Sequence, residues 1–335
     1  MKARWEDLTA RTRGLATHLV TPVQLEALAR APDLDSLRDA FRALGLLVPE
    51  AGTATAEQLE LSVRRAAAAR LRTLTRWAGA RKALLAVVFE DEDRRSLRAM
   101  LRGAVQGATP EERLGGLIPT PALPERALGE LARLPTTGAV AALLAAWGSP
   151  YGLALLPEAA AAHPDLLTLE YRLSRAFVIR ALQGARAARS RQLVEFVRDT
   201  VDLENAGTAF VLAGTERETS PGLAFLDGGR RLPLAAFLDA AAAPDAEEAG
   251  RRLAAAFRPD PIAATLEHHA GDPAALEEAI LRQRIVTLHA RAWWDPMGPA
   301  AVLGYVLRLR AEVLDLRRTI WGVALRVPPR LAPIP

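Results

Sequence analysis

Acidic and polar residues at helical spacing are the residues of this sequence best able to do chemistry. The stretch VDLENAGTAFVLAG, which begins at Val201, carries Asp202 and Asn205 three positions apart. On a helix these two side chains share one face, and that face continues into Ala206 and Phe210, which a core would bury. A carboxylate beside an amide could form a catalytic site. It could equally be a structural device, and such a device should recur if the chain is built from repeats.

The same spacing occurs three times along the chain. An acid is followed by a small polar residue three positions later and by an apolar residue eight positions later. The leading acids are 109 and 110 residues apart. The three sets are Asp93, Ser96 and Leu101; Asp202, Asn205 and Phe210; and Glu312, Asp315 and Ile320.

A second pattern precedes each of these sets by 32 to 35 residues. It is a glutamate with an apolar residue three positions later and an arginine five positions later. With turn residues between the two patterns, the spacing predicts two helices of about 14 residues in each copy, joined by a short connection. The members are Glu60, Val63 and Arg65; Glu170, Leu173 and Arg175; and Glu277, Ile280 and Arg282.

Self-similarity at a fixed period predicts a repeat architecture. We therefore expect three helical subdomains of about 110 residues, with boundaries at 1–120, 121–228 and 229–330. Ala, Leu, Arg and Glu, which favour helices, fill most segments, so the predicted fold is all-α. The one strand signal is an Asp-Gly turn in FLDGGRRLPL (225–234), which predicts a small local hairpin. The alternative is chance similarity in a chain rich in Ala, Leu and Arg.

Capping patterns predict where several helices start. Four segments fit a capping box, in which a Thr or Asp side chain and a Glu or Gln three positions later each bond to the other's backbone. They are TPVQ (21–24), TAEQ (55–58), TPEE (109–112) and DAEE (245–248). The two Asp-Pro pairs place a capping acid before proline at the first helical position. These two pairs are Asp272-Pro273 and Asp295-Pro296.

Composition narrows the classes of function. The chain has no cysteine, which excludes disulfides and thiol chemistry. Its longest apolar run is about nine residues, against about 20 for a membrane-spanning helix, so we expect a protein that is soluble by itself. The formal charge is only +4 and the charges alternate in sign, which does not favour nucleic acid as a partner. The Arg-rich segment 180–193 lacks aromatics, and we interpret it as a solvated helix end.

Other signs of site chemistry are weak. An enzyme has one set of groups at one site, whereas these polar positions recur, so we expect no catalytic residue. No two of the five histidines have the i, i+4 spacing of a helical metal site, and the sequence contains neither a phosphate-binding loop nor G-x-S-x-G. We expect no metal, no cofactor and no small-molecule substrate. The repeated polar residues should instead start helices or join neighbouring helices, with the three arginines paired to acids or solvated.

Several stretches resemble a known family. They are WEDLTARTRGLATHLVT (5–21), EDEDRRSLRAMLRGAVQG (90–107), VDLENAGTAFVLAG (201–214), FLDGGR (225–230) and the segment 295–322. In these the chain resembles, over essentially its full length, the central-stalk C subunit of prokaryotic A/V-type rotary ATPases, the counterpart of the d subunit of the eukaryotic V-ATPase. The D-x-x-N of the family is intact only at 202–205, since Ser96 and Asp315 replace the amide in the other copies.

The resemblance implies a funnel-shaped, all-helical protein with three subdomains around a pseudo-threefold axis. Such a protein is a non-catalytic adaptor that sits on the cytoplasmic face of the membrane proteolipid ring. It receives the foot of the central shaft and transmits torque for ATP-coupled proton or sodium transport. The alternatives are another α-helical repeat scaffold or an α-helical enzyme with an unrecognised site. Among six tryptophans we expect one or two at an interface: Trp5, Trp77, Trp147, Trp293, Trp294 and Trp321.

Overall fold

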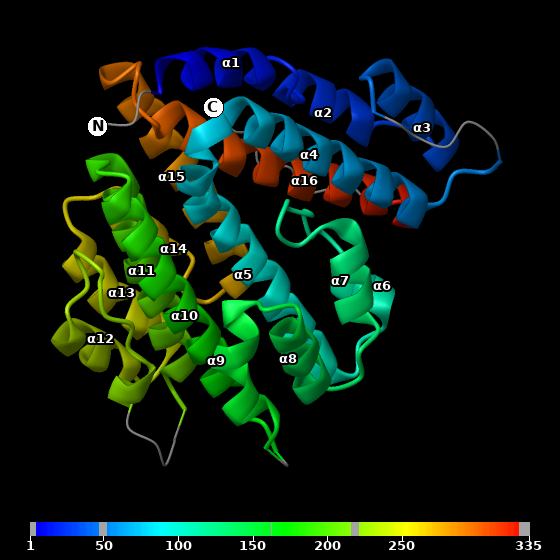
Figure 1. Ribbon diagram of the computed structural model, residues 1–335. Coiled ribbons are helices and arrows are strands. Elements are labelled where there is room, and N and C mark those ends of the chain that lie inside the picture. The colour runs from blue at the N-terminus through cyan, green and yellow to red at the C-terminus, as the bar shows by residue number, and fades with distance from the viewer. Residues whose placement is uncertain (1–4, 47–51, 162, 216–220, 328–335) are drawn as a thin grey trace. The chain divides into compact units, whose positions relative to one another are not determined.

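The computed structural model of the chain describes residues 5–46, 52–161, 163–215 and 221–327 (Figure 1). Within these ranges all regular secondary structure is helical, in sixteen α-helices and two short 3-10 helices. The predicted all-α fold is therefore confirmed.

The helix lengths follow one order three times along the chain. Three helices of 7–12 residues precede two helices of 22–26 residues. The first series is α1 (Glu6–Ala16), α2 (Pro22–Ala29), α3 (Leu34–Ala43), α4 (Ala56–Ala78) and α5 (Lys82–Gln106). The second is α7 (Glu125–Ala132), α8 (Thr137–Ala146), α9 (Pro150–Ala159), α10 (Leu166–Ala187) and α11 (Arg191–Leu212). The third is α12 (Leu234–Ala241), α13 (Ala246–Phe257), α14 (Ile262–His268), α15 (Pro273–Trp294) and α16 (Ala300–Leu325).

Three short elements lie between these series or inside them. They are η1 (Gly79–Arg81), α6 (Pro110–Leu114) and η2 (Pro221–Ala224).

The long helices are the pairs that the sequence indicated, but their predicted length of about 14 residues is wrong. Glu60, Glu170 and Glu277 are each the fifth residue of their helix, whereas Asp93 and Asp202 are the twelfth residue of theirs. The measured spacing therefore joins the start of one helix to the middle of the next. Strong helix formers extend each helix well beyond that span.

The capping predictions are largely confirmed. Thr21, Thr55 and Thr109 each form a complete capping box at the start of α2, α4 and α6. At α13 the Asp245 side chain accepts from the backbone of Glu248, without the reciprocal bond. These bonds satisfy N–H groups that the first helical turn leaves without a partner.

One start signal was correct and its counterpart was wrong. Asp272 accepts the N–H groups of Ala274 and Ala275 at the start of α15. Asp295-Pro296 does not start α16, which begins at Ala300 after Pro299. A second proline and a glycine follow the first pair, so the chain forms a turn there and the helix starts four residues later.

The described residues pack into two compact units. The middle unit is Thr136–Thr287, and the terminal unit joins Arg4–Pro135 to Leu288–Pro335. These units follow packing and do not coincide with the three predicted subdomains. The subdomain boundaries are a statement about internal repeats, which superposition would test, and they stay a prediction.

In the terminal unit the last long helix packs against the first helices of the chain. Helices α4 and α16 lie side by side, and α1, α2 and α3 follow one another along α16 (Figure 1). Helix α5 contacts α6 and α7. Fully buried side chains of α4 and α16, among them Leu59, Leu74, Leu316 and Ile320, form the contact. Each such side chain contributes about 1.5–3 kcal/mol relative to its exposed state.

The middle unit is a sequence of neighbouring helices. Helix α9 packs on α8 and α10, and α11 packs on α10, α12 and α13. Its core gathers Phe237, Leu253, Phe257 and Leu266 with small alanines of α11. Because Ala206 and Ala209 of α11 are fully buried, neighbouring elements approach that helix closely. This close approach places the polar residues of α11 against the chain that follows it.

Candidate functional site

Asp202 holds a loop of the middle unit through main-chain hydrogen bonds. Its carboxylate is fully buried and accepts the backbone N–H groups of Arg230, Arg231 and Leu232, at 2.9–3.2 Å. Burial raises the pKa of Asp202, and these donors act in the opposite direction. A buried carboxylate with its lone pairs occupied by main-chain donors is a structural group and has no free oxygen for a substrate.

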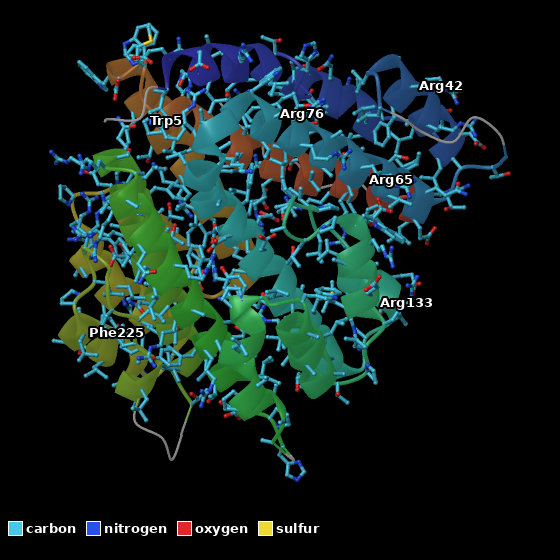
Figure 2. All side chains as sticks on the ribbon, viewed as in Figure 1. Trp5, Arg42, Arg65, Arg76, Arg133 and Phe225 are labelled. Atoms are coloured by element: carbon cyan, nitrogen blue, oxygen red, sulfur yellow. The ribbon has the colours of Figure 1, made fainter. Side chains whose placement is uncertain are left out.

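Asn205 forms further hydrogen bonds to the same loop. Its side-chain amide donates to the carbonyl of Leu226 at 2.9 Å, and its side-chain oxygen accepts the N–H of Leu226 at 2.8 Å. Next to this pair, Phe225, which is labelled in Figure 2, packs on Phe237 with ring centroids 5.2 Å apart. The amide thus satisfies both main-chain groups of one buried residue, as a neighbouring strand would. Here the acid and the amide are a structural device.

The glycine at 229 is required by this contact. A Cβ at Gly229 would lie 2.1 Å from Oδ1 of Asp202, far inside van der Waals contact. Gly228, with φ of +112°, has a conformation that other residues rarely adopt. The Asp-Gly-Gly sequence therefore serves to bring the main chain onto the carboxylate.

The predicted hairpin at 225–234 is wrong. The described part of the chain contains no strand there, and Leu234 already begins α12. The N–H groups that a hairpin would pair across its strands are taken by Asp202 and Asn205 instead. The Asp-Gly signal indicated a turn correctly but could not show what the turn was bonded to.

Glu60 is the corresponding anchor of the terminal unit. Its carboxylate accepts the N–H of Gly116 at 2.7 Å and the indole N–H of Trp321 at 2.8 Å. Nε of Arg317 lies 3.1 Å from the same carboxylate, an ion pair without the alignment of a hydrogen bond. One side chain of α4 thereby joins the segment after α6 to the last turns of α16.

A second ion pair joins α4 to α16. Arg70 donates to Glu312 at 2.6 Å and to the carbonyl of His18 at 2.8 Å. Burial raises the pKa of Glu312, against the attraction of Arg70. Tyr305, two turns away on the same helix, is 2% exposed, and burial raises its pKa to about 12. A phenol with that pKa stays protonated and cannot act as a base near neutral pH.

The acids at the middle of α5 are also buried and bonded to other side chains. Asp91 pairs with Arg94 at 2.8 Å, and Glu92 pairs with Arg310 of α16 at 2.8 Å. Asp93 accepts the hydroxyl of Thr120 at 2.5 Å. These contacts fix α5 against α16 and against the segment before α7.

Asp93 is the group with the largest upward pKa shift for which a value is resolved. Burial, with smaller effects from Glu92 and Glu90, raises its pKa to about 7, and the hydroxyl of Thr120 lowers it only in part. A carboxyl with a pKa near neutrality is a candidate acid or base in a cleft. Its oxygen faces a threonine that also accepts two backbone N–H groups, so the surroundings are those of a structural contact.

The other predicted positions do not form a common site. Arg65 pairs with Glu125 of α7 at 2.9 Å (Figure 2), whereas Arg175 is exposed. Arg282 pairs with Glu278, an acid on its own helix and one position beyond the Glu277 of the pattern. The remaining positions are Ser96 and Asp315, which are buried, Glu170, which is half-buried, and Glu277, which is exposed. The repeated positions therefore share a place in the helix order, but not a common set of partners.

Sequence reasoning missed the buried charges around these positions. It did not single out Arg70, Glu92 or Arg310, although they form ion pairs between helices. A usable signal was present in the consecutive acids EDED at 90–93. Four successive helical residues point to nearly all sides, so at least one of them had to face a neighbour.

The buried carboxylates Asp202, Glu60, Glu312 and Asp91–Asp93 are thus bonded to neighbouring groups within their units. In the part of the chain that the structure describes, no three His, Asp or Glu side chains are grouped to hold a metal ion. Arg64, which is buried, donates to the carbonyl of Leu117 and so also acts as a structural donor. Glu60, Asp93 and Asp202 join long helices to segments that follow them, whereas Glu312 bonds to α4, which precedes it.

Comparison with known proteins identifies the family of this chain. A family model described as the ATP synthase (C/AC39) subunit matches residues 8–331, nearly the whole chain. The chain belongs to this family. A search of curated proteins found no match. As the resemblance predicted, this C/AC39 chain is a relative of the C subunit of the A/V-type ATPases, and its all-helical fold is consistent with that membership.

Membership makes the chain a subunit of an ATP synthase complex. None of the helices in the described ranges is long and apolar enough to cross a membrane.

Proposed function

We propose that this C/AC39 chain is the rotor adaptor of an A/V-type ATPase. It would link the central shaft of the soluble head to the proteolipid ring and transmit torque between them without chemistry of its own. It would act on the cytoplasmic side, held peripherally at the membrane through the complex. The observation that carries the proposal is the family match over residues 8–331.

The described contacts support a mechanical role. A part that transmits torque must resist deformation, and long helices joined by buried ion pairs and hydrogen bonds do so. Removing one partner of a buried ion pair typically costs about 3–5 kcal/mol, because the other charge is left unpaired. The pairs Arg70–Glu312 and Arg310–Glu92 fix α16 to α4 and α5 within the terminal unit.

We also propose that the chain is built of three related subdomains, with boundaries at 1–120, 121–228 and 229–330. The support is the order of three short and two long helices, which occurs three times within those ranges. Superposition of α1–α5, α7–α11 and α12–α16 tests it. Unrelated helix arrangements in the three segments would overturn it.

The functional test is reconstitution of the ATPase in liposomes with and without the C/AC39 chain. Without it, the soluble head should still hydrolyse ATP, and ion uptake should disappear because torque no longer reaches the ring. Uptake that persists at normal coupling without the chain would end the adaptor proposal. Turnover of a substrate by the purified chain would favour an enzyme instead.

A further inference from the structure

The C-terminal end of α15 carries the most exposed aromatic side chains of the described chain, and Met297 of the turn to α16 lies beside them in the sequence. Trp293 is 79% exposed, Trp294 86% and Met297 58%. By contrast, Trp5 is 5% exposed. Two adjacent tryptophans with most of their surface in water are a costly arrangement unless something covers them, and such exposure marks interaction sites. We call Trp293, Trp294 and Met297 the aromatic tip.

Helix α1 holds this turn in place. The Thr9 hydroxyl donates to the carbonyl of Gly298 at 3.0 Å in a buried contact. Arg13 reaches the carbonyls of Ala292 and Pro296 at 3.5 and 3.4 Å. The main chain on both sides of the tip is therefore fixed by α1, and the tryptophans are displayed on a preformed support. A preformed surface loses less entropy on binding than a flexible one.

Charged side chains lie on the elements beside the tip. The same helix α1 also contacts the α4–α5 turn, where Asp7 pairs with Arg81 at 2.6 Å and Arg11 lies over the ring of Trp77 at 5.7 Å. Helix α1 is only about 16 Å long, so both turns lie at one end of the terminal unit. Arg11, Arg13 and Lys82 are exposed there, as are the acids Glu6, Asp7 and Asp295. Asp7 is paired with Arg81, so the bases are in slight excess.

We propose that the aromatic tip inserts into the headgroup region of an anionic lipid bilayer. Tryptophan favours that region because its ring is apolar while its N–H stays hydrated. The basic residues beside it complement lipid phosphates. The tip projects from a turn, and a fluid bilayer closes around a projection, whereas a protein partner would need a matching hollow. The inference deepens the proposed function, since an adaptor seated on a membrane ring has the bilayer within reach.

Vesicle flotation with the purified full-length chain tests the inference. We expect the chain to float with phosphatidylcholine vesicles containing phosphatidylglycerol, less with phosphatidylcholine alone, and less as salt is raised. Trp293→Ser with Trp294→Ser should lower the bound fraction by about tenfold or more, because membrane binding scales with buried apolar area. Trp147→Ser, which alters a 40% exposed tryptophan of the middle unit, is the matched control and should bind like the parent.

Charge and depth give two further readouts. Arg11→Gln with Lys82→Gln should weaken binding to the anionic vesicles but not the weaker binding to neutral ones. Brominated lipids should quench the emission of the parent more than that of the double tryptophan variant. Both tryptophans are exposed, so the variant should melt like the parent, and the single variants Trp293→Ser and Trp294→Ser serve if it does not.

Two results would overturn the lipid assignment. One is a parent chain that does not bind anionic vesicles, or a double tryptophan variant that binds as well as the parent. The other is intact vesicle binding by the variant together with lost binding to a detergent-purified, lipid-free proteolipid ring, which would make the tip a protein contact. The proposed function is judged separately, by whether the parent chain couples hydrolysis to ion uptake.

Discussion

Trp321 donates its indole N–H to Glu60 across 2.8 Å, and these two residues lie 261 positions apart in the chain. The bond joins the last long helix to the first one. It lies in the terminal unit, where α1, α2 and α4 pack on α16. The carboxylate of Glu60 contacts a main-chain N–H, an indole and a guanidinium. Its removal should therefore destabilise the whole unit.

Glu60→Gln should lower the free energy of unfolding of the terminal unit by about 1–3 kcal/mol, because buried hydrogen bonds to a charged group are lost or weakened. Urea titration followed by tryptophan emission measures it, since Trp321 reports directly on the site. Glu57→Gln, an exposed change one turn earlier on α4, is the control and should be nearly neutral. Equal effects of the two substitutions would contradict the contact.

Asn205→Leu should destabilise the middle unit by about 1–3 kcal/mol, because the N–H and the carbonyl of Leu226 would both lose their buried partner. Thermal melts of parent and variant decide it. Gln183→Leu replaces an exposed amide on α10 of the same unit and should change the melting temperature little. An unchanged melt for Asn205→Leu would mean that the amide does not hold the loop.

Two glycines near the same loop should respond in opposite directions. Gly229→Ala would place a methyl group 2.1 Å from Asp202 and push the main chain off its carboxylate, so it should destabilise the unit. Gly207→Ala lies on α11 with open space around the added methyl and should stabilise it by about 0.5–1 kcal/mol. Chemical denaturation of both variants provides the comparison. A neutral Gly229→Ala would show that the loop is not seated on Asp202.

The pKa of Asp93 gives a pH-dependent prediction. Its folded pKa of about 7 lies above the ordinary value of 3.8, so between these values the folded chain holds a proton that the unfolded chain has lost. This group therefore makes stability fall as the pH rises from about 4 to about 7. Asp93→Asn keeps an oxygen for the hydroxyl of Thr120 but cannot titrate.

The stability of Asp93→Asn relative to the parent should accordingly grow with pH over that window and level off above it. Urea titrations at several pH values measure the difference. The control is Asp39→Asn, whose parent side chain is 61% exposed. A constant difference between Asp93→Asn and the parent would mean that the carboxyl is ionised throughout the range.

The sequence predicted the fold class and the order of the long helices because these depend on local preferences. Thr55 with Gln58, for instance, specifies its own helix start through neighbouring groups. The recurrence of the same spacing also predicted a structural role for Asp202 and Asn205, and that role stays a prediction. The surroundings of these residues could not be predicted, because Asp93, Asp202 and Glu312 occupy similar helix positions and have different partners.

Pairs of residues far apart in the chain could not be predicted from the sequence, for a physical reason. Arg70 and Glu312 are 242 positions apart, and only packing determines which acid meets which arginine. The hairpin prediction failed for the same reason, since the partner of the loop is a side chain of α11. The exposed tryptophans could not be separated from the buried ones either, because exposure depends on how distant segments pack.

The last prediction separates a structural role of the polar positions from a direct role in the motor. If Glu60 and Asn205 act only by holding their units together, Glu60→Gln and Asn205→Leu should leave ion uptake per ATP unchanged at temperatures well below the onset of melting. Coupling should fail only as each variant begins to unfold, at a lower temperature than the parent. Parallel assays of hydrolysis and uptake in liposomes at rising temperature measure this, with Glu57→Gln and Gln183→Leu as controls. Lost coupling at low temperature, in a variant that is still folded by circular dichroism, would instead give that residue a role in the motor beyond holding its unit together.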